Sequence, residues 1–135
     1  MADAVKKKDN ILHDKSLNFA FRCVSLYKYL VYERDEKEYV MSRQILKSGT
    51  SVGANIRESK NAQSPADFVG KLSIALKEAD ETQYWLELLK YGEFLSDKEY
   101  ELMNNDVKEL IALLTSIIKT EKKKQNINLK LRVEV

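Results

Sequence analysis

The sequence is poor in residues that interrupt or cross-link a chain. Its 135 residues include one proline, four glycines and one cysteine. So few turn-forming residues, with 44% hydrophobic and 33% charged residues, favour a single all-helical domain. The lone Cys23 cannot form an internal disulfide. Its neighbours Phe21 and Val24 predict that it is a small buried side chain rather than a reactive thiol.

Residues that carry catalytic chemistry are also scarce, since His13 is the only histidine. A di-iron bundle site needs a Glu-x-x-His motif on two helices, and a hydrolytic triad needs a well-placed histidine, so both are excluded. Glu78 and Glu81 share a helical face and could bind a cation, alone or with Glu58. A metal-dependent enzyme is thus an alternative, but a solvated acidic flank is the favoured interpretation. We predict no enzymatic activity, no cofactor and no metal.

Long hydrophobic runs are absent. No segment approaches the roughly 18 apolar residues of a membrane span, and the charged start MADAVKKKDN lacks the apolar core of a signal peptide. We therefore predict a cytoplasmic protein without a membrane partner. The net charge is only +2, so any contact with nucleic acid has to come from local clusters of cations.

Apolar residues recur at helical spacing in four segments. The first helix begins near residue 14 and the second near residue 37 or 38. The third begins at Pro65 behind the cap Ser64, and the fourth follows a capping box opened by Ser96. The predicted inward positions are Leu17, Ala20, Val24, Tyr27 and Val31 in the first helix; Met41, Ile45, Ser48, Val52, Ile56 and Ser59 in the second; Phe68, Leu72, Ala75, Ala79, Thr82, Leu86 and Leu89 in the third; and Met103, Val107, Leu110, Leu114 and Ile117 in the fourth.

Four such segments with short connections predict an all-α, up-down-up-down four-helix bundle over residues 14–124. Residues 1–13 are expected to form a disordered arm. In the tail, residues 125–135, apolar and polar residues alternate, which is typical of a β-strand. A lone strand has no ladder partner within a helical chain, so this tail is expected either to pair with a partner or to stay flexible.

Two of the four glycines, Gly49 and Gly53, lie in the stretch KSGTSVGANIRES. The helical period runs through this stretch without interruption, so we predict a helix rather than a loop. Each glycine costs a helix about 1 kcal/mol relative to alanine. Close approach of a neighbouring helix would offset that cost. We expect Asn55 and Glu58 to hydrogen-bond to another helix or subunit.

A row of cations lies opposite the apolar stripe of the second helix. Arg43, Lys47 and Arg57 share one outward face, and Lys60 follows close by. Such a row can bind phosphates, although an ordinary charged surface is the alternative. The lysines at 6–8 and 122–124 either add to nucleic-acid affinity or only solubilise the chain ends.

Aromatic side chains of the first helix point in several directions, and Trp85 with Tyr84 flanks the apolar seam of the third. One small bundle cannot cover apolar surface on so many sides, so we predict self-association. The residues assigned to helix packing or to an oligomer interface are Gly49, Gly53, Asn55, Glu58, Glu81 and Trp85.

Two stretches resemble a known bacterial family, the four-helix-bundle proteins encoded in intervening sequences of the 23S rRNA gene. SRQILKSGTSVGANIRES resembles the family's second helix, and DFVGKLSIALKEADETQYWLELL resembles its third. The resemblance covers roughly residues 14–120. Gly53 stands where the signature often has proline, and Ser59 where it often has glycine. The matching positions are Gln44, Ser51, Val52, Asn55, Ile56, Glu58 and Ser59 in the first stretch, and Asp67, Phe68, Ile74, Ala75, Glu81 and Thr82 in the second.

This resemblance implies a homopentamer without known enzymatic activity. A relative, the accessory protein of diversity-generating retroelements, is basic and binds nucleic acid and a reverse transcriptase. The resulting prediction is a non-catalytic oligomer that binds structured RNA, or DNA, or that assists a nucleic-acid enzyme such as a reverse transcriptase. The alternative is a protein-interaction scaffold that binds no nucleic acid and whose tail adds a strand to a partner.

Overall fold

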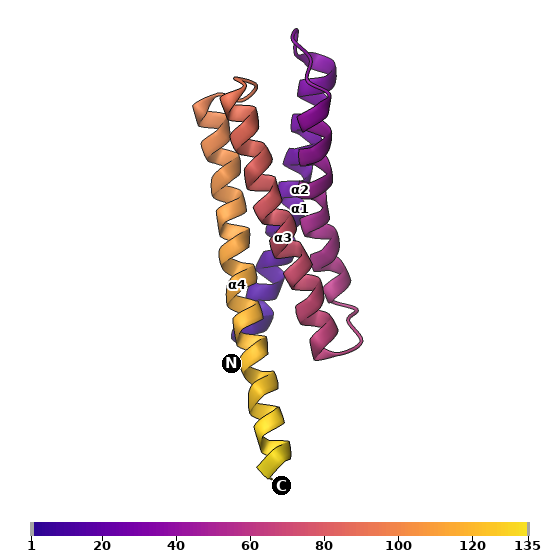
Figure 1. Cartoon of the computed structure of the whole chain (residues 1–135), viewed down its shortest axis with the longest axis vertical. Helices are drawn as coiled ribbons and strands as arrows, with labels where there is room; N and C mark the ends of the chain where they lie inside the picture. The colour runs from indigo at the N-terminus through magenta and orange to yellow at the C-terminus, as the bar shows by residue number, and fades with distance from the viewer. Residues whose placement is uncertain (1, 135) are drawn as a thin grey trace.

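Four helices pack in sequence order around a common core (Figure 1). The computed structural model describes residues 2–134, so Met1 and Val135 lie outside the described residues. The helices are α1 (Ala2–Lys28), α2 (Val40–Ser59), α3 (Pro65–Tyr91) and α4 (Asp97–Glu134), and the π-helical turn η1 (Tyr29–Glu33) continues α1. Each helix packs against the next, and α1 also packs against α4. The predicted up-down-up-down bundle is confirmed.

Both ends of the chain differ from the sequence prediction. The first helix begins at Ala2, and Leu12 is fully buried, so the disordered arm expected over residues 1–13 is wrong for residues 2–13. The last helix continues to Glu134, so the strand or flexible segment expected after residue 124 is wrong for residues 125–134. A helix satisfies its own backbone hydrogen bonds, whereas a strand at this position would need a partner that the bundle does not supply.

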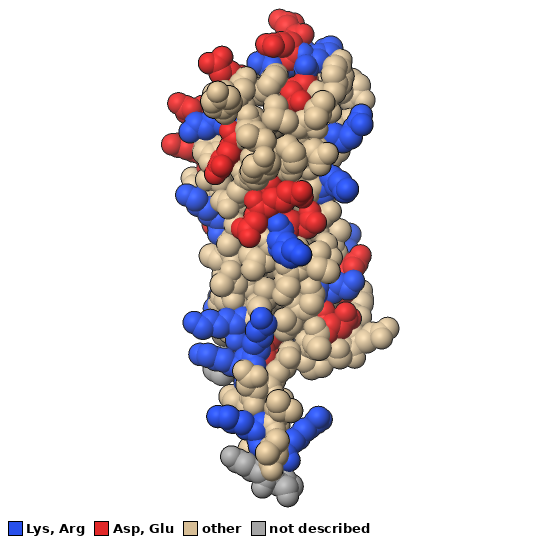
Figure 2. All heavy atoms as spheres, viewed as in Figure 1, with Lys and Arg blue, Asp and Glu red and all other residues tan. Residues whose placement is uncertain are grey.

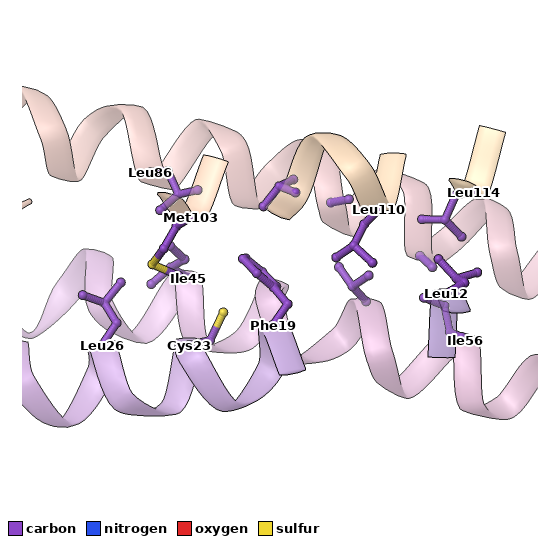
Figure 3. Close-up of a cluster of buried hydrophobic side chains, with 14 of the residues drawn as sticks. Leu12, Phe19, Cys23, Leu26, Ile45, Ile56, Leu86, Met103, Leu110 and Leu114 are labelled. Carbon is purple, nitrogen blue, oxygen red and sulfur yellow. The ribbon is translucent and has the colours of Figure 1, made fainter. Parts of the chain in front are cut away.

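The inward faces of the last three helices follow the predicted period. All five predicted positions of α4 are buried, as are all those of α3 except the half-buried Phe68. In α2 only Met41 among the predicted positions is half-buried rather than buried. Figure 3 shows Ile45, Leu86 and Met103 converging from three helices. These contacts form one continuous core along the bundle.

The inward face of α1 is displaced by one residue from the prediction. Val24 is 44% exposed and Leu17 is half-buried, although both belong to the predicted stripe. A shift of one residue rotates a helix by about 100°, so part of the predicted stripe lies on an outer face. Among the described side chains of α1 and η1, the buried ones are Leu12, Ser16, Phe19, Cys23, Leu26, Leu30 and Val31.

The glycines of α2 explain this rotation. A Cβ on Gly49 would lie well inside contact distance of the Cys23 sulfur, and a Cβ on Gly53 would lie 3.4 Å from the Ser16 carbonyl oxygen. The small side chains of α1 therefore pack onto the glycines of α2. The predicted close approach is present, and the approaching helix is α1 of the same chain.

Three polar contacts join α1 to α4. Lys8 Nζ donates to Ser116 Oγ at 3.0 Å, and Lys15 Nζ lies 2.6 Å from a Glu109 carboxylate oxygen. The third contact is an ion pair between Arg22 and Asp106. The donors lie seven residues apart, so they share one face of α1. This antiparallel seam was not predicted from the sequence.

The N-terminus of α2 is capped by a glutamate that precedes the helix. The Glu38 carboxylate accepts hydrogen bonds from the backbone N–H groups of Val40, Met41 and Ser42, at 2.9, 2.8 and 2.6 Å. Glu38 itself is buried. Its side chain is longer than that of the usual Asp or Ser cap, so it reaches these donors from outside the helix.

The C-terminus of α3 ends in a left-handed residue that is not glycine. Glu93 has a φ of 65°, and the Phe94 N–H donates to the Leu89 carbonyl at 2.9 Å. This is the pattern of a Schellman cap, in which glycine usually occupies the left-handed position. Gly92 lies one residue earlier, at the C-cap, and has a φ of −75°. The Arg34 guanidinium lies 4.6 Å from the centre of the Phe94 ring and covers the turn.

Replacing Glu93 with glycine is expected to raise the free energy of unfolding by about 0.5–1 kcal/mol. A left-handed conformation costs a non-glycine residue about 1–2 kcal/mol, and the greater freedom of glycine in the unfolded chain offsets part of the gain. Urea denaturation measures the change. The matched control is Glu93→Ala, which removes the same carboxylate but keeps a Cβ. An equal gain in the alanine variant would contradict a backbone origin.

Candidate nucleic-acid and self-association surfaces

The predicted row of cations lies on the outer face of α2. Arg43, Lys47, Arg57 and Lys60 are all exposed. None of the four takes part in an ion pair with the side chains that the structure describes. Their charges are therefore available to an anionic partner such as a phosphate backbone.

Carboxylates next to this row reduce its positive field. The Glu78 carboxyl of α3 has its pKa raised, first by burial and then by the nearby Glu81 carboxylate, while the Lys47 charge acts in the opposite direction. Lys47 thus has Glu78 as an acidic neighbour. Glu81, whose carboxylate interacts with that of Glu78, is exposed. No group of three metal-ligating side chains occurs in the part of the chain that the structure describes. Glu78 and Glu81 therefore form an acidic flank beside the row.

Glu58 and Asn55 behave differently from each other. Lys71 Nζ of α3 donates to a Glu58 carboxylate oxygen at 3.0 Å, as expected for a contact between helices. This hydrogen bond, more than the charge of the carboxylate, raises the pKa of Lys71. Asn55 donates instead to the Ser51 carbonyl of its own helix at 2.9 Å, and it makes no hydrogen bond to another helix among the described residues. Its expected contact with another subunit stays a prediction.

A groove between α1 and α2 runs along the glycine-containing stretch. The groove has a volume of about 420 Å³. Its lining includes four small residues, which are Ala20, Thr50, Gly53 and Ala54. Arg57 also lines this α1–α2 groove. On α1, the apolar side chains of Phe21 and Val24 are exposed. This face combines small and apolar side chains, as expected for a surface that packs against another helix.

Trp85 lies on a second aromatic flank, on α3. It is half-buried against the core, and its ring packs edge-on against Tyr84 with 5.2 Å between the ring centres. Its buried indole N–H has no hydrogen-bond partner in the described part of the chain, and Tyr84 is exposed. A buried indole N–H usually finds a partner, so this flank is a second candidate interface.

The structure brings the two lysine-rich ends of the chain together, which sequence reasoning did not anticipate. The contact between Lys8 and Ser116 places the start of α1 beside the middle of α4, and both termini lie at the same end of the bundle (Figure 1). Figure 2 shows basic side chains gathered at this end. The sequence contained the lysine signal, but the continuation of α4 as a helix was needed to bring the clusters together.

Cys23 is buried, as predicted, and it lies against Gly49. Burial raises the pKa of its thiol to about 12, since the interior disfavours the thiolate. The thiol is therefore protonated at neutral pH and acts as a small core side chain.

Comparison with known proteins assigns the chain to a family. Residues 8–116 match the family described as 23S rRNA-intervening sequence protein. The chain belongs to this family. It also resembles a crystal structure of a protein of unknown function from the S23 ribosomal protein family of Bacteroides thetaiotaomicron, with 62% identity and a TM-score of 0.80. That match covers 83% of this chain and 98% of the other.

No curated protein matches the chain. Among the described residues of this intervening-sequence protein, no helix combines the length and apolar character that crossing a membrane requires.

Proposed function

We propose that this intervening-sequence protein is a non-catalytic, cytoplasmic homo-oligomer that binds nucleic acid, with structured RNA as the main ligand. It would act alone or as an accessory to a nucleic-acid enzyme such as a reverse transcriptase. The observation that carries the proposal is the α2 row, in which Arg43, Lys47, Arg57 and Lys60 are exposed and unpaired among the described side chains.

Self-association makes this row effective. Four cations on one bundle give a weak contact, especially beside the Glu78 and Glu81 flank, but several copies on one oligomer bind together. The α1–α2 groove and the Trp85 flank are two surfaces through which copies can pack. A pentamer is the assembly that the family resemblance implies. Sedimentation of a monomer across a wide concentration range would contradict this part of the proposal.

Binding to duplex RNA and DNA is expected to weaken steeply with salt. For duplex DNA, the slope of log K against log salt is about −0.9 per phosphate contact. The variant Arg43→Gln/Lys47→Gln/Arg57→Gln/Lys60→Gln is therefore expected to flatten this slope and to lower affinity at low salt. Fluorescence anisotropy with labelled duplexes measures both. If the wild-type protein binds neither RNA nor DNA at about 50 mM salt, the proposed function is wrong.

A protein-interaction scaffold is the second candidate function. It is favoured by the end of α4, where four apolar side chains are exposed: Ile127, Leu129, Leu131 and Val133. Such side chains are typical of a segment that packs against another protein. An oligomer that binds no nucleic acid even at low salt would favour the scaffold.

A further inference from the structure

The last part of α4 projects from the bundle as a helical arm (Figure 1). We define the C-terminal arm as residues 119–133, of which residues 119–125 still lie against the bundle and the rest project from it. After Gln125, every side chain described in this arm is exposed. Lys124 is paired with Glu121, with 3.3 Å between Nζ and the carboxylate oxygen. The arm's other cations have no ion-pair partner among the described side chains; they are Lys119, Lys122, Lys123, Lys130 and Arg132.

Three of these cations share one face of the arm. Lys119, Lys123 and Lys130 follow a 4-3-4 spacing in which Asn126 occupies the position between Lys123 and Lys130. At 1.5 Å per residue, this face is about 17 Å long. One strand of a B-form duplex places a phosphate about every 3.4 Å along the axis, so this length spans about five phosphates. The face therefore presents polar and basic groups along the length of a short backbone segment.

The start of α1 extends the basic surface. Lys8 contacts Ser116, three residues before Lys119, and Lys6 and Lys7 are exposed in the same turn of α1. Two described carboxylates line a hollow at this end together with Lys60: Asp9, and Glu121, which is already paired with Lys124. Positive charge therefore outweighs negative charge at this end, although the whole chain is almost neutral.

The apolar residues of the arm favour nucleic acid over a membrane surface. Ile127 and Leu131 lie on one face of the helix, and Leu129 and Val133 lie on a different face. A helix that binds in a membrane interface needs one continuous apolar face opposite its cations. This arm has two separate apolar strips, so it does not meet that requirement.

We infer that the C-terminal arm, together with Lys6 and Lys7, is the main phosphate-binding surface of this protein. The inference rests on the proposed nucleic-acid function. It assigns that function a second surface, which binds phosphates more strongly than the α2 row does. All of this surface lies outside residues 8–116, the part that matches the family. Binding through the arm is therefore a property of this chain beyond its shared bundle.

The test compares two full-length variants with equal changes of charge. Lys119→Gln/Lys123→Gln/Lys130→Gln removes the basic face of the arm. Lys28→Gln/Lys98→Gln/Lys108→Gln removes three exposed lysines elsewhere. For duplex DNA, the arm variant is expected to flatten the slope of log K against log salt by about 2.7, at 0.9 per lost contact, while the control keeps the wild-type slope. Circular dichroism and sedimentation confirm that both variants keep their helices and assembly.

The outcomes separate the inference from the function on which it rests. If the wild-type protein binds duplexes and both variants keep its slope, the arm is not the phosphate surface although the function stands. If the wild-type protein binds no duplex at low salt, the proposed function fails. Wild-type binding to phosphatidylserine vesicles in place of nucleic acid would overturn the inference in favour of a lipid surface.

Discussion

Replacing Gly49 with alanine is expected to lower the free energy of unfolding by up to about 2 kcal/mol, even though alanine is the better helix former. The added Cβ would collide with the sulfur of Cys23, which is buried on α1, so the sulfur or the helix has to shift. Overpacking of a core costs about 1–3 kcal/mol, and the helix preference of alanine returns about 1 kcal/mol. Urea denaturation measures the difference.

The chain supplies matched controls for this substitution. A Cβ on Gly70 would meet nothing within 4 Å, so Gly70→Ala is expected to raise stability by up to about 1 kcal/mol. At Gly53 the nearest atom is the Ser16 carbonyl oxygen at 3.4 Å, so Gly53→Ala is expected to lie between these two results. Adding Cys23→Ala to Gly49→Ala restores part of the loss. A Gly49→Ala variant as stable as Gly70→Ala would show that α1 does not depend on this glycine.

Replacing Glu38 with alanine is expected to cost about 2–3 kcal/mol of stability. Its carboxylate satisfies three backbone N–H groups at the start of α2, and the side chain is buried. Loss of an N-terminal cap costs up to about 2 kcal/mol, and a hydrogen bond to a charged group contributes about 1.5–3 kcal/mol. Water can reach part of this helix end in the variant, so the three losses do not add fully. Thermal or urea unfolding measures the result.

Glu36→Ala is the control for this effect. Its side chain is 82% exposed and lies 4.0 Å from the Arg34 guanidinium, so its removal is expected to change stability by less than about 0.5 kcal/mol. Glu38→Gln keeps one acceptor oxygen without the charge and is expected to fall between the two. Equal stability of the Glu36 and Glu38 alanine variants would contradict the capping role.

The inward faces of the last three helices were predictable because the spacing of their apolar residues fits only one face of each helix. In α3 and α4, large aliphatic residues repeat at intervals of three and four, and no second stripe of similar strength competes with them. The predicted N-terminal caps of α3 and α4 are also confirmed. Ser64 accepts from the Asp67 N–H, and Ser96 and Glu99 form the reciprocal capping box.

The first helix was harder because it carries two apolar stripes one residue apart. The outer stripe contains Val24, and the buried stripe contains Ser16 and Cys23, which look less hydrophobic. The choice between the two depends on the partner surface, where Gly49 and Gly53 admit small side chains. Periodicity within one helix holds no information on the shape of the helix it contacts.

The candidate binding surfaces were predictable only in part. The exposed row on α2 follows from helical spacing alone. The basic end needs two facts that lie far apart in the sequence, the packing of α1 on α4 and the helical continuation of α4 past residue 124. Alternation of apolar and polar residues in the tail predicted a strand, because that pattern says nothing of whether a ladder partner exists.

The seam between α1 and α4 has a consequence for the order in which the bundle forms. Contacts between successive helices close short stretches of chain, whereas Lys8 and Ser116 lie 108 residues apart. Closing so long a loop carries a larger entropic cost, and contacts of this kind slow folding. The three pairs of successive helices can therefore form early, and docking of α1 onto α4 completes the four-helix bundle last. The basic end is assembled only in that final step, so a chain that has not finished folding does not yet present it.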